Sequence, residues 1–347
     1  MIQQHEMPLT SVVIIGKNEQ DTIESCIISI FNQTYPDFEI IYVDDNSSDD
    51  TMVKAQRLKN IMPNKNCKRY EIISVSSGYP SKNRNIGSKI AKGTVIAFID
   101  ADCIAEQNWL LNLISKLPNG SGVVGGPLAL RHNNDSNTTK AIDSVLTSFL
   151  GSGGSAQFYE IKEDRQVAAV PAGNMAIHKH LLEKLGGFNE KLRYNEDSFL
   201  CYTARKQGFK IYYSAKAKVS HFVAIDSYSN FVSYFRRYGF ARGKNVRRDF
   251  HLLAKFNLVS LGLILSGISL LILSFLSSTA TIILVCLIIL ILSVEFAYSL
   301  KLAMAHRSVK LFFMFSLFFI SLHIMYNLGF IQGLISNKNK VTMTSAN

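Results

Sequence analysis

Three long apolar segments near the C-terminal end constrain this chain more than any other feature of its sequence. Residues 256–275, 280–300 and 311–335 are each twenty residues or longer and apolar on all sides. A helix needs about 20 apolar residues to cross the hydrocarbon core of a bilayer. The alternative is a soluble helical bundle, whose surface helices would each carry a polar face. The sequence therefore predicts a transmembrane region of about three helices over residues 256–335.

Basic residues are concentrated beside these segments. Residues 236–347 contain twelve Lys or Arg and only two Asp or Glu, whereas residues 1–235 hold nearly equal numbers of both signs. Residues 228–244 place aromatic side chains at helical spacing between basic ones, which is the profile of an amphipathic helix at a membrane surface. We predict a basic interfacial region over 228–255 that contacts membrane lipids. Nucleic-acid binding is the alternative for such a cluster, and the apolar segments that follow argue against it.

The charges that flank the apolar segments predict their orientation. Cytoplasmic loops of membrane proteins are enriched in Lys and Arg. Seven such residues precede the first segment, none lies in the first loop at 276–279, and the second loop carries Lys301, Arg307 and Lys310. This pattern predicts a multi-pass protein of the cell membrane with its N-terminal domain in the cytoplasm and its C-terminal tail outside. Two lysines in that tail oppose the last assignment.

Two negative observations narrow the class of protein further. Residues 1–8 lack a basic stretch followed by an apolar run, so we expect no secretory signal peptide there. The five cysteines have no CxxC or histidine-paired spacing, so we expect neither a zinc site nor a disulfide framework.

The N-terminal two thirds of the chain has the pattern of an alternating α/β fold. Short apolar runs predict strands at 11–15, 39–43, 69–74 and 94–99. Helical periodicity predicts helices at 21–32, 51–58 and 81–91. Such alternation is typical of a doubly wound parallel sheet, in which ligands bind beyond the carboxyl ends of the strands. The Gly-, Ser- and Asn-rich region 120–154 is interpreted as loops that border the site.

Polar clusters follow three of the predicted strands. They are Lys17-Asn18-Glu19, Asp44-Asp45 and Asp100-Ala101-Asp102. Two carboxylates one residue apart would repel each other if both faced one pocket. A divalent cation that bridges them and a diphosphate removes this repulsion, so we predict a metal site at Asp100 and Asp102. The alternative there is a solvated turn, and at Asp44-Asp45 it is a cap for the next helix.

Several motifs resemble, in order, those of the family 2 glycosyltransferases. They are Ser-Val-Val-Ile-Ile-Gly-Lys-Asn-Glu (11–19), Val-Asp-Asp-Asn-Ser-Ser-Asp-Asp-Thr (43–51), Lys-Asn-Arg-Asn-Ile-Gly (82–87), Phe-Ile-Asp-Ala-Asp (98–102), Pro-Ala-Gly-Asn-Met-Ala (171–176), Gly-Gly-Phe-Asn-Glu (186–190) and Asn-Glu-Asp (195–197). The resemblance covers roughly residues 9–245. It implies an α/β fold of the GT-A type, with a doubly wound mixed sheet, as a cytoplasmic catalytic domain over 9–227 followed by a C-terminal helical membrane anchor. Processive members of the family carry a Gln-x-x-Arg-Trp motif, and this chain instead reads Phe-Arg-Arg-Tyr-Gly at 235–239.

The resemblance also implies roles for residues of the donor site. Glu19 and Asp45 would contact the nucleoside, and Arg84 the base or the diphosphate. Asp100 would help to hold the sugar or ribose, and Asp102 would bind the divalent metal, Mn²⁺ or Mg²⁺.

Further roles follow for residues later in the chain. Asp197, preceded by Glu196, resembles the general base that takes the proton from the acceptor hydroxyl; the alternative is a helix cap, and a phosphate acceptor would need no base. His221 would lie near the diphosphate or the metal, unless it is a buried histidine at a strand end. Arg236 and Arg237 would bind diphosphate oxygens or anionic lipid.

The leading hypothesis is a metal-dependent, inverting glycosyltransferase of the hexosyltransferase type that is anchored in the membrane. It would move a sugar from a nucleotide-diphospho-sugar donor to a lipid or lipid-linked glycan acceptor, in the synthesis of a cell-envelope glycan or glycolipid. One alternative is a processive polysaccharide synthase, against which the departing motif and the small membrane region argue. The other is an inactive membrane scaffold of the same fold, against which the intact carboxylates argue.

Overall fold

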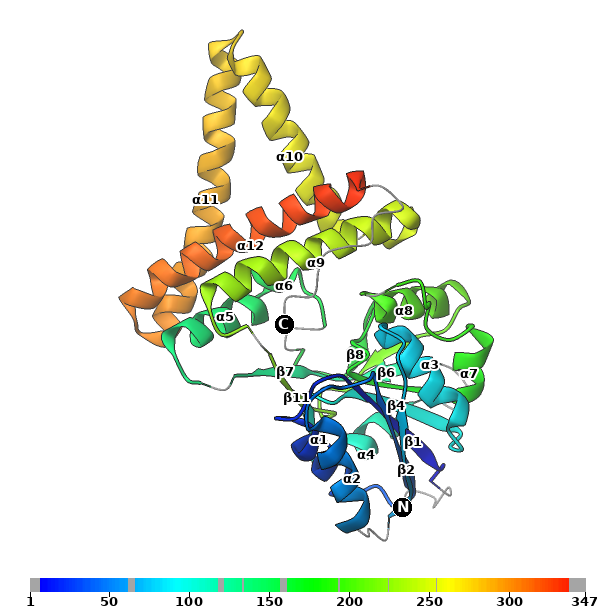
Figure 1. Cartoon of the computed structure of the whole chain (residues 1–347). Coiled ribbons are helices and arrows are strands. Elements are labelled where there is room, and N and C mark those ends of the chain that lie inside the picture. Colours follow the sequence, from blue (N-terminus) through cyan, green and yellow to red (C-terminus); the bar gives the residue numbers. More distant parts are fainter. Residues whose placement is uncertain are drawn as a thin grey trace. The chain divides into compact units, whose positions relative to one another are not determined.

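The chain forms two compact units. Residues Met1–Asn133 and Gly154–Ala224 make the first, called the sheet unit here, and residues Asn134–Gly153 and Ile225–Asn347 make the second, called the helical unit. The computed structural model describes residues 7–61, 66–117, 122–132, 134–156, 161–192, 194–223, 225–253 and 255–336. Most of segment 1–8 and the predicted C-terminal tail lie outside the described residues. Figure 1 labels the elements of both units.

A mixed sheet of eight strands forms the centre of the sheet unit. In spatial order the strands are β3 (Cys67–Ser74), β2 (Phe38–Asp44), β1 (Thr10–Gly16), β4 (Val95–Asp100), β9 (Asn174–His178), β6 (Val123–Gly125), β10 (Ile211–Tyr213) and β8 (Arg165–Gln166). The four strands predicted from apolar runs are β1 to β4, and they are parallel to one another. β9 is antiparallel to β4 and β6. The sheet is therefore mixed, as the family resemblance implies, and not wholly parallel as the strand–helix alternation suggests.

Helices cover both faces of this sheet. One face packs against α1 (Ile23–Phe31), α2 (Thr51–Ile61) and α4 (Trp109–Ile114). The other packs against α3 (Pro80–Ile90), α7 (Lys179–Lys184) and α8 (Glu196–Lys206). Successive residues of β1 enter opposite cores, with Val12 on the α1 side and Val13 on the α3 side. Burial on both faces explains why the first strands read as continuous apolar runs.

A smaller sheet of three strands completes the sheet unit. Its order is β5 (Cys103–Ala105), β11 (Val219–Phe222) and β7 (Leu128–Arg131). β5 begins three residues after the end of β4, and its antiparallel pairing with β11 places Cys103 opposite His221. This small sheet therefore brings a distant histidine next to the Asp-x-Asp segment.

The helical unit consists mainly of four long helices. These are α9 (Tyr228–Arg248), α10 (Lys255–Ser274), α11 (Ser278–His306) and α12 (Val309–Ile335), with a short 3₁₀ helix at Phe250–Leu252 after α9. Among the described residues, three helices are long and apolar enough to cross a membrane: residues 256–274 of α10, and the whole of α11 and α12. Within this unit α9 and α12 lie side by side, and α10 and α11 form a hairpin that extends away from them (Figure 1).

The interpretation of 120–154 as loops is wrong. The segment contains β6, β7, α5 (Asn137–Thr147) and α6 (Phe149–Ser152), and its residues 134–153 belong to the helical unit. Ser136 caps α5 in a reciprocal capping box with Thr139. The buried face of α5 packs against α12, more than 150 residues later in the chain. An 11-residue helix whose apolar partner is so distant gives only a weak periodic signal.

Two ionisable residues of the apolar helices pair with each other. Oε1 of Glu295 in α11 lies 2.8 Å from Nδ1 of His323 in α12. Glu295 is buried, so its carboxylate faces His323 and not the surroundings of the helices. A partner gained by packing satisfies a polar group that would otherwise be costly in an apolar helix.

Candidate active site

The three polar clusters predicted at strand ends lie at one edge of the larger sheet. β1 is parallel to both of its neighbours, and its last residues pair with Asp44 of β2 and Asp100 of β4. The loops that carry Glu19, Asp45 and Asp102 therefore leave the sheet at the same edge. The structure thus places the three clusters together at one edge of the sheet.

Arg84 of α3 joins two carboxylates of the predicted site. Its Nη1 donates to Oε1 of Glu196 and its Nη2 to Oδ1 of Asp100, both at 2.6 Å. The guanidinium is only 4% exposed. α3 can approach the sheet this closely because Gly87, one turn later, has no side chain, and a Cβ there would overlap Val13. Both terminal nitrogens of Arg84 thus bind carboxylates of the protein. A contact of Arg84 with the nucleotide-sugar donor stays a prediction.

Burial shifts the protonation equilibria of this ion-paired group. Burial raises the pKa of Glu196 to about 7, although the charge of Arg84 opposes the shift. Burial likewise raises the pKa of Asp100, against the opposing charges of Arg84 and His221. Burial alone would lower the pKa of Arg84, but the two carboxylates raise it. Arg84 therefore stays charged, and the group exchanges a proton near neutral pH.

Asp102 and His221 form a second pair at the start of the small sheet. Nε2 of His221 lies 3.0 Å from Oδ2 of Asp102. Burial disfavours the charged form of each residue, but their hydrogen bond and mutual attraction lower the pKa of Asp102 and raise that of His221. Among the described residues, Nδ1 of His221 is buried without a hydrogen-bond partner.

The donor atoms of this pair fit a divalent cation. Asp102, Cys103 and His221 each offer a ligand atom, and these atoms lie within 4.8 Å of one another. Carboxylate oxygen and imidazole nitrogen are donors that bind first-row divalent ions. Burial raises the pKa of the Cys103 thiol well above its ordinary value, so it stays a neutral, soft donor that suits Mg²⁺ or Mn²⁺ poorly. Sequence analysis missed Cys103, whose only signal is that it directly follows Asp102.

Glu19 shares the electrostatic environment of Asp102. Burial, followed by the charges of Asp102 and Asp100, raises the pKa of Glu19 to about 7. The hydroxyl of Thr22 donates to Oε2 of Glu19 at 3.0 Å and stabilises its charged form. The structure thus brings Glu19 next to the predicted metal site, and its predicted contact with a nucleoside stays a prediction.

Asp45 organises the loop after β3. Its Oδ1 accepts backbone N–H groups from Ser77 at 2.7 Å and Gly78 at 3.1 Å. Gly78 has φ +68°, a conformation that glycine adopts without strain. Asp49, not Asp45, accepts the backbone N–H of Thr51 at the start of α2. The helix-capping alternative therefore applies to Asp49, and Asp45 retains Oδ2 for the predicted contact with a nucleoside.

Asp197 lies in the first turn of α8, one residue after Glu196. Its Oδ2 accepts the backbone N–H of Ala172 at 3.3 Å, and its charge contributes to the raised pKa of Glu196. Gly173, the residue after Ala172, lies so close to the edge of the sheet that a Cβ there would be 2.9 Å from Oδ2 of Asp100. The segment 171–174 thus joins the predicted base to the edge of the site, a contact that sequence analysis missed because only packing creates it.

Arg236 and Arg237 belong to α9 of the helical unit, not to the sheet unit that carries the other predicted site residues. Both are exposed. Nε of Arg236 donates to Oε1 of Gln332 in α12 at 3.3 Å. Their predicted contacts with a donor or with anionic lipid stay predictions.

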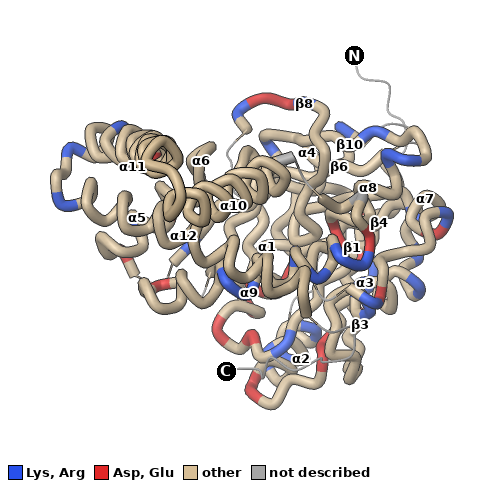
Figure 2. The backbone as a smooth tube through the Cα atoms, turned by 90° about the horizontal axis from the view of Figure 1, so that it is seen from above, with Lys and Arg blue, Asp and Glu red and all other residues tan. Residues whose placement is uncertain are grey.

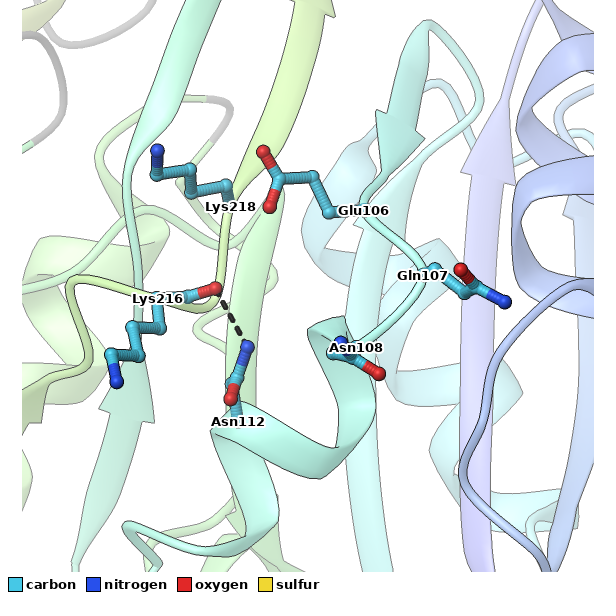
Figure 3. Close-up of a pocket in the computed structure, with 6 residues that line it drawn as sticks. All are labelled: Glu106, Gln107, Asn108, Asn112, Lys216 and Lys218. Atoms are coloured by element: carbon cyan, nitrogen blue, oxygen red, sulfur yellow. Dashed lines mark hydrogen bonds between the residues drawn. The ribbon is translucent and has the colours of Figure 1, made fainter.

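A separate pocket of about 480 Å³ lies at the other end of the β5–β11 pair (Figure 3). Its walls are Glu106, Gln107, Asn108, Asn112, Lys216 and Lys218. Nδ2 of Asn112 donates to the carbonyl oxygen of Lys216 at 2.8 Å across it. The pairing of Val219 with Ala105 and of His221 with Cys103 places this pocket away from the Asp102–His221 pair.

The family assignment rests on the segment that builds this edge of the sheet. Residues 11–186, just over half of the chain, match Glycosyl transferase family 2. This chain is a family 2 glycosyltransferase. The matched residues include the clusters after β1, β2 and β4, Arg84 and the segment at 171–174.

Relatives of this glycosyltransferase include enzymes of lipid-linked glycan synthesis. Glycosyltransferase AglE of Haloferax volcanii is 29% identical over 191 residues, which cover 54% of this chain and 58% of that protein. The GalNAc(5)-diNAcBac-PP-undecaprenol beta-1,3-glucosyltransferase of Campylobacter jejuni is 29% identical over 206 residues, which cover 59% of this chain and 63% of that protein. The chain spans less than two thirds of the length of these curated relatives.

A solved structure shares the fold over nearly the whole chain. Mannosyltransferase PcManGT from Pyrobaculum calidifontis, in complex with GDP-Man and Mn²⁺, superimposes with a TM-score of 0.62 at 16% identity. The match covers 95% of this chain and 88% of that one. This glycosyltransferase therefore has a GT-A type α/β domain together with C-terminal apolar helices.

Proposed function

We propose that this glycosyltransferase moves a hexosyl group from a nucleotide-diphospho-sugar to a lipid-linked acceptor, with inversion at the anomeric carbon, at the cytoplasmic face of the cell membrane. One observation carries the proposal. Asp102 and His221 lie 3.0 Å apart at the same sheet edge as the Arg84-linked carboxylates. This arrangement offers ligand atoms for a cation, and beside them lie acidic groups that exchange protons near neutral pH.

Asp102 and His221 are the proposed ligands of Mn²⁺ or Mg²⁺, with Asp100 beside them. When bound, the cation would neutralise charge on the departing nucleoside diphosphate. Asp100 is oriented by Arg84 Nη2, so its second oxygen is free to face the sugar or the ribose. The structure of PcManGT with GDP-Man and Mn²⁺ supports a nucleotide sugar and a divalent cation as the binding partners.

Glu19 and Asp45 are the proposed contacts of the nucleoside. Both come from loops that follow neighbouring strands, and carboxylates in this position accept hydrogen bonds from ribose hydroxyls or a base edge. Arg236 and Arg237 remain the proposed contacts of diphosphate oxygens or of anionic lipid.

Asp197 is the proposed general base. Its side chain is oriented by the N–H of Ala172, and it would take the proton from the acceptor hydroxyl as that oxygen attacks the anomeric carbon. Glu196, paired with Arg84, directly precedes Asp197 in the chain, and both Glu196 and Arg84 act as positioning residues for it. Attack from the face opposite the leaving diphosphate inverts the configuration.

A lipid-linked acceptor is supported by the apolar helices and by the Campylobacter jejuni relative, which is a glucosyltransferase for an undecaprenol-linked glycan. Confining enzyme and acceptor to one membrane raises their effective concentration. The proposed acceptor is therefore a sugar hydroxyl carried on a polyprenyl phosphate or diphosphate.

The test is sugar transfer in membranes that contain the full chain. The membranes are incubated with radiolabelled UDP- and GDP-sugars in turn, with and without EDTA, and the lipids are extracted. We expect label from one donor in the lipid fraction, its loss in EDTA, and its recovery with Mn²⁺ or Mg²⁺; Asp102→Asn membranes should lose most of it. Label that persists in excess EDTA would refute the metal assignment, and label confined to a water-soluble polymer would refute the acceptor class.

A further inference from the structure

α12 differs from the other apolar helices in what covers it. Residues of α10 and of the first half of α11 are exposed around most of the helix. In contrast, α12 has a long face buried within the helical unit, against α9 and α5 among others. A helix so covered cannot be placed in a membrane without its partners.

α9 and α12 run parallel with their backbones in contact. Each contributes two glycines four residues apart, Gly239 and Gly243 in α9 and Gly329 and Gly333 in α12. A Cβ on any of the four would overlap a backbone carbonyl of the other helix. Small residues at this spacing let helices approach closely. In a membrane, the two helices must therefore lie at the same depth over the length along which they are in contact.

The polar partners across this contact confirm its register. Tyr228 Oη lies 2.7 Å from Ser321 Oγ near the beginning of α9. Arg236 reaches Gln332, and Arg247 donates to the carbonyl oxygen of Ser336 just after α12 ends. The whole of α9 is thus aligned with roughly the last two thirds of α12.

α9 is too basic to lie inside the hydrocarbon core. Its part from Arg236 to the end carries six basic residues: Arg236, Arg237, Arg242, Lys244, Arg247 and Arg248. Arg and Lys are among the costliest residues at the centre of a membrane, whereas anionic headgroups attract them at its surface. If α12 crossed the bilayer, it would bring this basic part of α9 into the hydrocarbon core. The depth of α9 therefore sets the depth of α12.

Apart from Lys310 in its first turn, the uncovered side of α12 is a single apolar stripe. It consists of the exposed residues Val309, Phe313, Leu317, Ile324, Leu328 and Ile335. Their spacing of four and seven residues keeps them on one face of the helix. A helix with one apolar face beside a basic partner has the profile of an element that lies in the plane of a membrane surface.

The hairpin of α10 and α11 has the opposite character. Residues 256–294 contain no Asp, Glu, Lys or Arg, and most of α10 is tan in Figure 2, the colour of residues that are neither basic nor acidic. At the helical rise, the 20 residues of α10 span about 30 Å, the thickness of a hydrocarbon core. The hairpin is thus long enough to cross and carries no charged side chain before Glu295 that would oppose crossing.

We propose that α12 lies in the plane of the membrane surface beside α9, with its apolar stripe inserted at the headgroup–acyl boundary of a phospholipid leaflet, and that among the described helices only α10 and α11 cross the bilayer. The chain after residue 336 then lies on the same side as Lys255, where Lys338 and Lys340 agree with the enrichment of basic residues in cytoplasmic segments. This topology has one crossing fewer than hydropathy predicts. It concerns the membrane region alone and does not depend on the proposed sugar transfer.

Depth measurements along α12 test the proposal. The full chain with its native cysteines replaced by alanine receives single cysteines at Phe313, Ile324 or Ile335, each carrying a fluorophore, in vesicles with shallow or deep nitroxide lipids. Phe313 and Ile324 are about 16 Å apart along the helix axis by the helical rise. We expect the shallow nitroxide to quench all three sites alike. Preferential quenching of Ile324 by the deep nitroxide would overturn the proposal.

Matched sites on the hairpin calibrate this measurement. Leu265 in α10 and Val285 in α11 are also exposed apolar residues, and fluorophores there should be quenched best by the deep nitroxide. If these sites are as shallow as those of α12, the hairpin does not cross and the proposal fails.

A tag on the chain with its native cysteines gives an independent test. A peptide tag follows Asn347, and in other versions a tag precedes Met1 or is inserted at Ser277 between α10 and α11. In intact cells we expect antibody to reach only the tag at Ser277, and the two terminal tags to become accessible together after permeabilisation. A tag after Asn347 that is accessible in intact cells means a third crossing and overturns the proposal, whatever the transfer assay shows.

Discussion

The edge of the sheet in the sheet unit and the contact of α9 with α12 in the helical unit depend on different kinds of interaction. In the sheet unit, charged side chains from separate elements meet at the edge of a sheet, as when Arg84 binds both Glu196 and Asp100. In the helical unit, the closest contact is between the backbones of α9 and α12, which four glycines allow. The first kind of contact depends on charge and the second on the absence of side chains.

This difference has a consequence for how each unit responds to substitution. Removing a charge from the sheet edge leaves its partners buried without compensation, which changes both chemistry and stability. Adding carbon to a helix contact leaves every charge in place and changes only the distance between helices. Substitutions at the sheet edge and at the helix contact therefore separate the effect of a lost charge from the effect of a larger distance between helices.

The largest effect is expected for Asp197, the proposed general base. Asp197→Asn keeps an oxygen that can accept the N–H of Ala172 but removes the proton acceptor, so transfer to a hydroxyl acceptor should slow by about 10²–10⁴-fold. The measurement is turnover with a lipid-linked sugar, beside binding of the nucleotide donor, which should be little changed. A loss smaller than tenfold would contradict the role of Asp197. The outcome also reports the acceptor, because a phosphate acceptor needs no base.

Arg84→Ala should be the most damaging change to stability in the sheet unit. It leaves Glu196 and Asp100 without their cation, and breaking a buried ion pair costs about 3–5 kcal/mol. The measurement is thermal unfolding of the full chain in detergent. Arg84→Lys is the matched control, because it keeps the charge but not both hydrogen bonds. Its thermal stability should lie between those of the wild type and Arg84→Ala. Equal stability of all three proteins would mean that the ion pairs do not stabilise this unit.

Gly243→Leu is the corresponding change in the helical unit. The new side chain would meet the backbone of α12 at Phe330, and overpacking of this kind costs about 1–3 kcal/mol. Gly262→Leu in α10 is the control, since no atom lies within 4 Å of a Cβ at that position. We expect Gly243→Leu alone to lower the thermal midpoint in detergent. If both variants behave alike, the contact between α9 and α12 is not stabilising.

An effect that disappears in acid is expected for Glu39, which reports on charge inside the sheet unit away from the site. Burial opposes its ionisation, but hydrogen bonds from Ser11, Arg69 and the N–H groups of Lys92 and Gly93 lower its pKa. Because the folded-state pKa is lower than the unfolded one, this carboxylate stabilises the fold above the unfolded pKa, and the stabilisation disappears as the pH falls through the folded pKa.

Glu39→Gln should therefore destabilise the protein at pH 7 by about 1–3 kcal/mol and much less in acid. Unfolding of variant and wild type at a series of pH values from 7 downward measures the difference. Glu71→Gln, which changes the more exposed partner of Arg69, should have little effect at any pH. A difference for Glu39→Gln that does not shrink in acid would show that the carboxylate charge is not its cause.

Much of the sheet unit could be predicted because its signals are local. The sequence pattern gave β1 to β4 within one or two residues of their observed bounds. The signal is clearest for β1, β2 and β4, which are buried on both faces and therefore mostly apolar, whereas β3 lies at the edge of the sheet and is only partly buried. The polar clusters after these strands had to meet, because parallel strands end at one edge. The family resemblance implied only that His221 lies near the diphosphate or the metal, and its direct pairing with Asp102, 119 residues earlier, comes from the tertiary structure.

Local signals thus determined the strands, the polar residues at their ends, the basic helix and the apolar segments. The tertiary structure decided which of these residues meet: Arg84 with Glu196, Asp197 with the N–H of Ala172, and α5 with α12. It also decided that α12 has a neighbour whose charges set its depth, whereas hydropathy gives only its length. The physical reason is that periodicity and hydropathy arise from neighbours along the chain. A hydrogen bond, an ion pair or a glycine contact depends on the distance between side chains that only packing brings together.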